Sequence, residues 1–282
     1  MGEERVNYGY LREARWHFAV LALLTAALYW RIVDSMIAQW LGDPNYSHGF
    51  LIPLITLYFL YERRTALRAA RIDPADSGLA VVLFGLFMLI AGYTATEFFT
   101  MRASLIVFIS GVVIFTLGWA VTRVVALPLL YLFFMVPLPY IIYDAVAFPL
   151  KLFVAKYSVM AMKLMGLPVL REGNIIIFPE ITLEVADACS GIRSLISLLA
   201  LSVAFGFLTQ KRVVGIILVA LSAVPIAIIT NGVRVIATGF LSQYYGAVAA
   251  EGFFHEFAGL TVFAAGLLLL GGVIVVVKRA VK

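Results

Sequence analysis

Long apolar segments dominate this sequence and decide what it can fold into. A helix needs about 20 mainly apolar residues to cross the hydrocarbon of a bilayer. Eight segments approach that length: Phe18–Trp40, Tyr46–Tyr61, Leu79–Thr94, Ala103–Thr122, Val124–Ile142, Ser190–Leu208, Val213–Thr230 and Glu256–Val277. Of the 282 residues, 63% are apolar and 13% are charged, against about half and a quarter in a soluble domain. The sequence therefore predicts an all-α polytopic membrane protein, and it excludes a soluble enzyme, a disordered chain and a disulfide-rich scaffold.

The positions of the basic residues predict how the spans are oriented. Loops on the cytoplasmic side of a membrane are enriched in Lys and Arg. With the N-terminus inside, most of the 21 basic residues fall in inner segments, for example Arg12, Arg64, Arg212 and Lys278. Both chain ends are then cytoplasmic. We expect a multi-pass protein of the cell inner (plasma) membrane.

Two segments between the fifth and sixth spans do not resemble ordinary spans. Ala145–Gly166 is apolar, but Lys151, Lys156 and Lys163 fall within about 140° of arc on a helix at 100° per residue. If this segment crossed the membrane, Arg212 would lie on the outer side. We interpret it as a helix in the outer interface, with a re-entrant segment broken at Pro149 as the alternative. Within Val169–Ala186, Ile181, Leu183 and Val185 alternate with Thr182 and Glu184, which is typical of a strand, and turn residues occur at 173–174 and 179–180. The segment therefore predicts a small external β-hairpin.

These elements predict one integral-membrane domain over residues 1–282, in three parts. Residues 1–142 hold five spans, residues 143–187 hold the interfacial helix and the hairpin, and residues 188–282 hold three spans that carry the candidate catalytic residues.

Three reactive side chains fall at the outer ends of the last three spans, although they are far apart in the sequence. Cys189 comes directly before the Ser190–Leu208 span. The following span returns outward and carries Asn231 and Arg234, and the last span begins outside just after His255. One inward and one outward crossing separate Cys189 from Arg234, and an outer segment of 21 residues leads from Arg234 to His255. We therefore expect these side chains to meet on the extracytoplasmic face.

The residue types in this set fit acyl transfer. A helix N-terminus and nearby positive charge lower the pKa of a thiol, which makes Cys189 a candidate nucleophile. His255 could protonate a departing amine, and Arg234 offers a permanently charged fork of donors to an oxyanion. The residues expected to support the reaction or to bind the substrate are Asn231, Arg193, Ser190, Asp187 and His48.

Other functions remain open at this stage. A polytopic transporter or channel could use Arg234, Glu251 and His255 to line a polar path. A non-catalytic envelope-assembly scaffold and a different thiol-dependent membrane acyltransferase are also compatible with the sequence. With one cysteine and three histidines in the chain, we expect no metal site and no cofactor.

Short motifs around these residues make a family resemblance specific. Ala188–Ser194 reads ACSGIRS, 231–234 reads NGVR, and His255 follows. In this order and spacing, and with YSHGFLIP at 46–53, the chain resembles the exosortase/archaeosortase family of integral-membrane cysteine transpeptidases. The resemblance covers nearly the whole chain.

The resemblance also implies roles and partners. Cys189 matches the nucleophile of the family, Arg234 its arginine and His255 its histidine. Family members process exported proteins that end in a short recognition motif, one transmembrane helix and a basic cluster, by way of a thioacyl intermediate, and transfer to a lipid or other envelope acceptor is expected. The longer members of the family carry an extra soluble C-terminal domain. We expect none here, since the sequence ends at Lys282. No nucleic-acid partner is expected.

Overall fold

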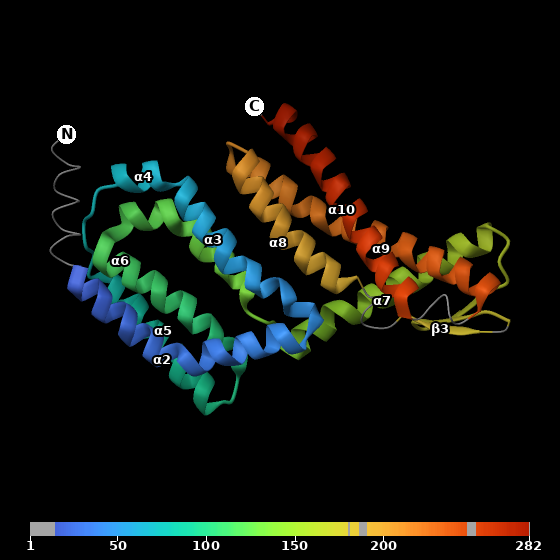
Figure 1. Ribbon diagram of the computed structural model, residues 1–282, viewed down its shortest axis with the longest axis horizontal. Helices are drawn as coiled ribbons and strands as arrows, with labels where there is room; N and C mark the ends of the chain where they lie inside the picture. Colours follow the sequence, from blue (N-terminus) through green and yellow to red (C-terminus); the bar gives the residue numbers. More distant parts are fainter. Residues whose placement is uncertain (1–14, 180, 186–190, 247–251, 282) are drawn as a thin grey trace. The chain divides into compact units, whose positions relative to one another are not determined.

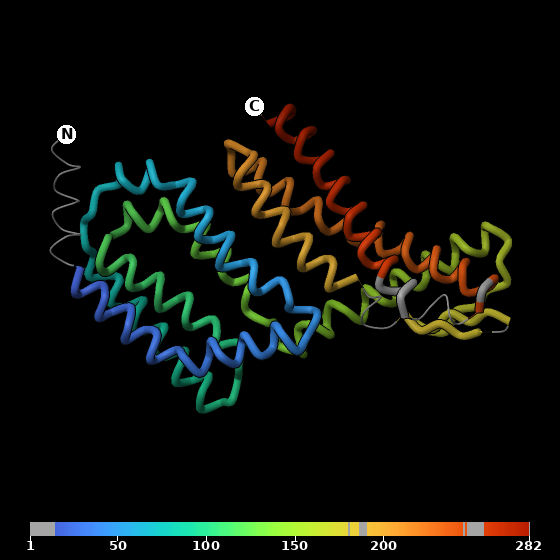
Figure 2. The backbone as a smooth tube through the Cα atoms, in the orientation of Figure 1, coloured from blue at the N-terminus to red at the C-terminus, as the bar shows by residue number. Residues whose placement is uncertain are grey.

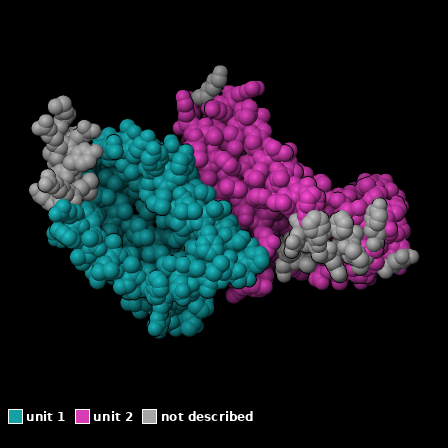
Figure 3. All heavy atoms as spheres, viewed as in Figure 1, with its two compact units in different colours: residues 1–139 teal, residues 140–282 magenta. Residues whose placement is uncertain are grey.

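The structure is a computed structural model that describes residues 15–179, 181–185, 191–246 and 252–281, without the side chains of residues 245 and 252–256. The chain forms two compact units, residues 1–139 and residues 140–282, which are coloured separately in Figure 3. Figure 1 labels most of the elements described below. Each unit is described by itself.

Helices make up unit 1. They are α2 (Arg15–Gly42), the 3-10 helix η1 (Pro44–Phe50), α3 (Leu51–Glu62), α4 (Arg64–Ala69), α5 (Ser77–Thr94), α6 (Phe98–Tyr131) and the 3-10 helix η2 (Leu132–Met135). A buried arginine joins two of them, because Arg102 of α6 donates a hydrogen bond of 2.6 Å to Oε1 of Gln39 in α2. This contact ties the two helices together through a polar group, as is common inside membrane proteins.

Glycines allow α5 and α6 to approach closely. Gly78, Gly85 and Gly92 recur every seven residues and are the buried positions of α5. A Cβ on Gly85 would lie 2.9 Å from the backbone nitrogen of Phe108, and one on Gly92 would lie 2.8 Å from the backbone nitrogen of Met101. Small residues at such contacts maximise packing between membrane helices, where no hydrophobic force drives association.

A bend at Gly118 divides α6 into two arms. Gly118 has φ 85° and ψ 176°, which is not helical, and a Cβ at this position would overlap the backbone carbonyl of Asp73. The chain changes direction within α6, as Figure 2 shows. The arms 98–117 and 119–131 correspond to the two spans expected at Ala103–Thr122 and Val124–Ile142, with the break a few residues earlier than predicted.

Unit 2 combines four helices with a small sheet. Its elements are α7 (Tyr140–Leu164), β1 (Leu170–Glu172), β2 (Ile175–Ile177), β3 (Thr182–Glu184), α8 (Ile192–Thr209), α9 (Val213–Tyr245) and α10 (Gly252–Ala280). The strands pair antiparallel in the order β1-β2-β3, with Ile176 opposite Leu183. The alternation in the sequence is confirmed: Thr182 and Glu184 are exposed, while Val185 is buried.

The all-α membrane fold with a small β element is confirmed, although some details differ from the prediction. Seven helices of the described chain are long and apolar enough to span a membrane. The count differs from eight for three reasons: the bent α6 counts once, α3 has only 12 residues after a 3-10 turn, and α7 qualifies. α7 is continuous through Pro149, so the break expected for a re-entrant segment is absent there. Its interfacial position stays a prediction.

Candidate active site

The first turn of α8 follows directly on a left-handed glycine. Gly191 is the N-cap residue, with φ 79° and ψ −2°, so the helix begins at Ile192 rather than at the expected Ser190. The carbonyl oxygen of Gly191 accepts hydrogen bonds from the backbone N–H of Leu195 and from the hydroxyl of Ser194, both at 2.8 Å. The N-terminus of a helix carries a partial positive charge, so the start of α8 favours a negatively charged group nearby.

Gly191 packs on Asn231 of α9. A Cβ added to Gly191 would lie 2.9 Å from Cγ and from Nδ2 of Asn231, and the Asn231 side chain is buried, with 2% of its surface exposed. A real Cβ is essentially never found so close to another side chain. Both the left-handed conformation and the close approach therefore require glycine at position 191.

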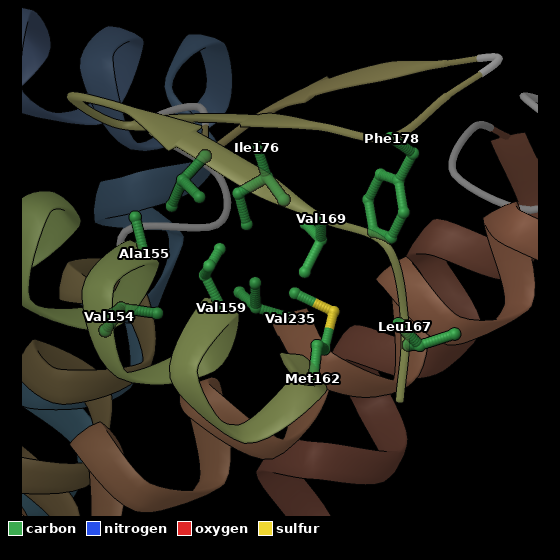
Figure 4. Packing of buried hydrophobic residues seen from close by; sticks show 10 residues of the cluster. Val154, Ala155, Val159, Met162, Leu167, Val169, Ile176, Phe178 and Val235 are labelled. Carbon is green, nitrogen blue, oxygen red and sulfur yellow. The ribbon is translucent and has the colours of Figure 1, made fainter. Parts of the chain in front are cut away.

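The same stretch of α9 also anchors the end of the sheet. Val185, which follows β3, belongs to a buried cluster that includes Val235 of α9. The other members come from α7 and from the sheet and its flanking loops. Figure 4 labels nine of the ten members, Val154, Ala155, Val159, Met162, Leu167, Val169, Ile176, Phe178 and Val235. Val185 thus shares a buried cluster with Val235, and Gly191 packs on Asn231 one turn earlier in α9.

Arg234 of α9 lies against α10. Its guanidinium carbon is 3.6 Å from the position that a Cβ would take on Gly259, and Nη1 and Nη2 lie 3.8 and 3.6 Å from the same point. His255 precedes Gly259 by four residues within α10, and residues four apart share one face of a helix. The side chain of His255 lies outside the described atoms.

These contacts lie about one membrane thickness from the basic end of the bundle. At 1.5 Å per residue, Arg234 is about 32 Å along α9 from Val213, and Gly259 is about as far along α10 from Ala280. The amide of Gln210, after α8, donates to the carbonyl of Ile274 in α10 at 3.3 Å. The basic residues near these ends therefore gather on one side of unit 2, and the contacts of Arg234 lie at the opposite side.

The remaining predicted residues divide into three groups. Cys189, Ser190 and Asp187 lie outside the described residues. Arg193 is exposed in the first turn of α8. His48 belongs to η1 of unit 1, so its place near the thiol stays a prediction. Among the described residues, no three His, Cys, Asp or Glu side chains are close enough to hold a metal ion.

His48 is partly buried within unit 1. Burial lowers the pKa of its imidazole below the usual 6.5, and the nearby backbone of Phe134 and Asn45 opposes this shift only in part. The neutral form of the imidazole is therefore favoured.

The neighbouring Gly49 lies in contact with the indole of Trp40. The indole Nε1–H donates a hydrogen bond of 2.9 Å to the carbonyl of Met135.

Sequence reasoning missed the two glycines that bring these segments together. Gly191 belongs to the ACSGIRS motif, but the sequence does not predict its contact with Asn231. The sequence also does not predict the contact of Gly259, since one glycine in an apolar helix has many explanations.

Comparison with known proteins gives one result. The family model described as Transmembrane exosortase (Exosortase_EpsH) matches residues 40–272 of the chain. No curated protein and no solved structure gives a significant match.

Proposed function

Because this chain belongs to the transmembrane exosortase family, we propose that it is a membrane-embedded cysteine transpeptidase with Cys189 as its nucleophile. Its substrates are exported proteins that carry a C-terminal recognition motif, one transmembrane helix and a basic tail. The active site faces the extracytoplasmic side of the inner membrane, where such a motif is exposed after export.

One structural observation carries the proposal. Val185 and Gly191 are both linked to α9, because Val185 shares a buried cluster with Val235 and Gly191 packs on Asn231. Cys189 lies between them in the sequence, two residues before Gly191, and a chain reaches at most about 7 Å over two residues. This arrangement supports a thiol close to the turn of α9 that carries Arg234.

The contact between Arg234 and α10 supports the third member of the set. The guanidinium group lies beside Gly259, one helical turn after His255. The start of α8, the turn of α9 that carries Arg234 and the turn of α10 that carries Gly259 thus lie at one end of the α8–α9–α10 bundle. This arrangement supports an acyl transfer in which the three residues act together.

The proposed reaction has two steps. The Cys189 thiolate attacks the carbonyl carbon of the scissile peptide bond, and the backbone N–H groups at the start of α8 together with Arg234 stabilise the oxyanion. The C–N bond then breaks, a thioester forms, and His255 gives its proton to the departing amine. In the second step an amine or hydroxyl of an envelope acceptor, or water, attacks the thioester and returns the thiol.

The test measures processing and the covalent intermediate together. The substrate is an exported protein of the same organism that ends in a motif, a transmembrane helix and a basic cluster. We expect Cys189→Ala to abolish cleavage at unchanged membrane abundance. Mass spectrometry of the wild-type protein should find a substrate peptide attached to Cys189. Ser222→Ala is the matched control, because this hydroxyl only donates to Val219 within α9. Full cleavage by the Cys189→Ala protein would refute the proposal.

A further inference from the structure

The small sheet of unit 2 has an unpaired edge. Its strands pair in the order β1-β2-β3, so β3 has a paired strand on one side only within the described part of the chain. The backbone groups of Ile181 and Val185 hydrogen-bond towards β2. Because consecutive residues in an antiparallel ladder bond to opposite sides, the N–H and C=O groups of Thr182 and Glu184 point to the open side. No other described residue hydrogen-bonds to these backbone groups.

The open edge also leaves part of an apolar face uncovered. Ile176 of β2 points into the buried cluster that the sheet forms with α7 and α9 (Figure 4), and 1% of its surface is exposed. Leu183 lies directly opposite Ile176 and therefore on the same face of the sheet. Leu183 and Ile181 are only partly buried, however. A further strand beside β3 would cover these two side chains.

The edge leads towards the proposed active site. Val185 follows β3 directly and shares the buried cluster with Val235, which is the residue after Arg234 in α9. Cys189 comes five residues after Glu184, a separation of at most about 18 Å. A polypeptide that lies along β3 would therefore lead to the segment of the proposed nucleophile.

We propose that the open edge of β3 binds the recognition motif of the substrate as an additional extended strand, an inference that rests on the proposed function. Main-chain hydrogen bonds to Thr182 and Glu184 supply affinity, and alternate side chains of the motif supply specificity. Every second motif residue packs beside Leu183. The occupant is a polypeptide rather than a lipid, because donors and acceptors that recur at the spacing of a strand match another extended backbone.

Proline substitutions test the edge on the protein side. Thr182→Pro removes an N–H that points to the open side, and edge strands tolerate proline at such a position. We expect kcat/KM for the substrate protein to fall about tenfold or more, because a hydrogen bond is lost and the ring obstructs the incoming strand. Arg171→Pro is the matched control. Its N–H points outward at the opposite edge, on β1, and kcat/KM should stay within about twofold of the wild type, because the motif does not bind there.

Ester substitution tests the same pairing on the substrate side. Synthetic substrates that contain the motif and the transmembrane helix carry one ester in place of a backbone amide, at successive motif positions. Each ester removes one N–H donor. Because every second residue of a strand bonds to a given neighbour, the esters should lower kcat/KM at alternate positions only.

The outcomes separate this inference from the proposed function. Equal kcat/KM values for Thr182→Pro and Arg171→Pro, or equal effects of esters at neighbouring positions, would overturn the inference and leave the dependence of cleavage on Cys189 intact. A changed oligomeric state of Thr182→Pro with unchanged cleavage would overturn it in favour of pairing between two copies. Absence of Cys189-dependent cleavage by the wild-type protein would refute the proposed function, and this inference with it.

Discussion

Gly191 lies in direct contact with the Asn231 side chain, at a point where a Cβ would come within 2.9 Å of the amide. The two residues are 40 positions apart in the sequence, at the start of α8 and within α9. Gly191 also takes the left-handed conformation. The proposed position of Cys189 near Arg234 rests on this contact.

Replacing Gly191 should therefore damage both stability and processing. We expect Gly191→Ala to cost about 1–3 kcal/mol of unfolding free energy, because it combines backbone strain with the overlap on Asn231, and to lower substrate cleavage strongly. Thermal unfolding in detergent and the cleavage assay measure the two effects. Gly232→Ala is the control, since its Cβ would meet nothing within 4 Å in the helix, and it should be neutral or slightly stabilising.

A double variant separates strain from overlap at the same position. Asn231→Ala removes the atoms that a Cβ at 191 would meet, so the combined variant Gly191→Ala/Asn231→Ala should lose less stability than the two single losses together. Strict additivity would show that the contact between the two residues contributes nothing.

The position of Arg234 should be sensitive to the size of the residue at 259. Gly259→Ala places a Cβ at 3.6 Å, an ordinary contact, and should retain most activity. Gly259→Leu displaces the guanidinium group and should lower kcat/KM by about tenfold or more, which is about 1.4 kcal/mol or more of transition-state stabilisation. Gly271→Leu on the same helix, where nothing lies within 4 Å, should leave kcat/KM unchanged. An equal effect at both positions would contradict the placement of Arg234.

The bend of α6 should not tolerate a side chain at 118. Gly118 has a positive φ, and its Cβ would overlap the carbonyl of Asp73. We expect Gly118→Ala to destabilise unit 1 by about 1–3 kcal/mol and to expose it to limited proteolysis. Gly42→Ala, at the end of α2 with nothing within 4 Å, is the comparison. If the Gly118→Ala and Gly42→Ala proteins resisted proteolysis equally well, the bend would not require glycine at position 118.

The partly buried imidazole of His48 should make stability depend on pH. Its pKa is lowered in the folded protein, so the unfolded chain binds the proton more readily and stability falls as the pH drops below about 6.5. His48→Gln should flatten the pH dependence of the melting temperature between pH 7.5 and 5.5. His17→Gln, at an exposed position, should keep the dependence of the wild-type protein. Identical curves for wild type and His48→Gln would contradict the burial effect.

Features that repeat along the chain were predictable. Apolar runs as long as a bilayer identified α2, α5, α8, α9 and α10, because membrane insertion depends on local composition. The alternation around Leu183 identified the strands, because neighbouring side chains of a strand face opposite sides. The bend at Gly118 was placed a few residues late, since the contact of this glycine with Asp73 leaves no periodic signal.

The sequence by itself determined the class of protein, the approximate spans and the motif order that matches the exosortase family, because hydrophobicity, periodicity and motifs are properties of continuous segments. Only the tertiary structure decided that Gly191 packs on Asn231, that Val185 and Val235 belong to one buried cluster, and that Arg234 lies beside Gly259. Such contacts depend on which faces of the helices meet and on how closely the helices approach. Small residues allow that close approach, but they occur at many positions of a membrane helix, so the sequence does not show which of them lie in a contact.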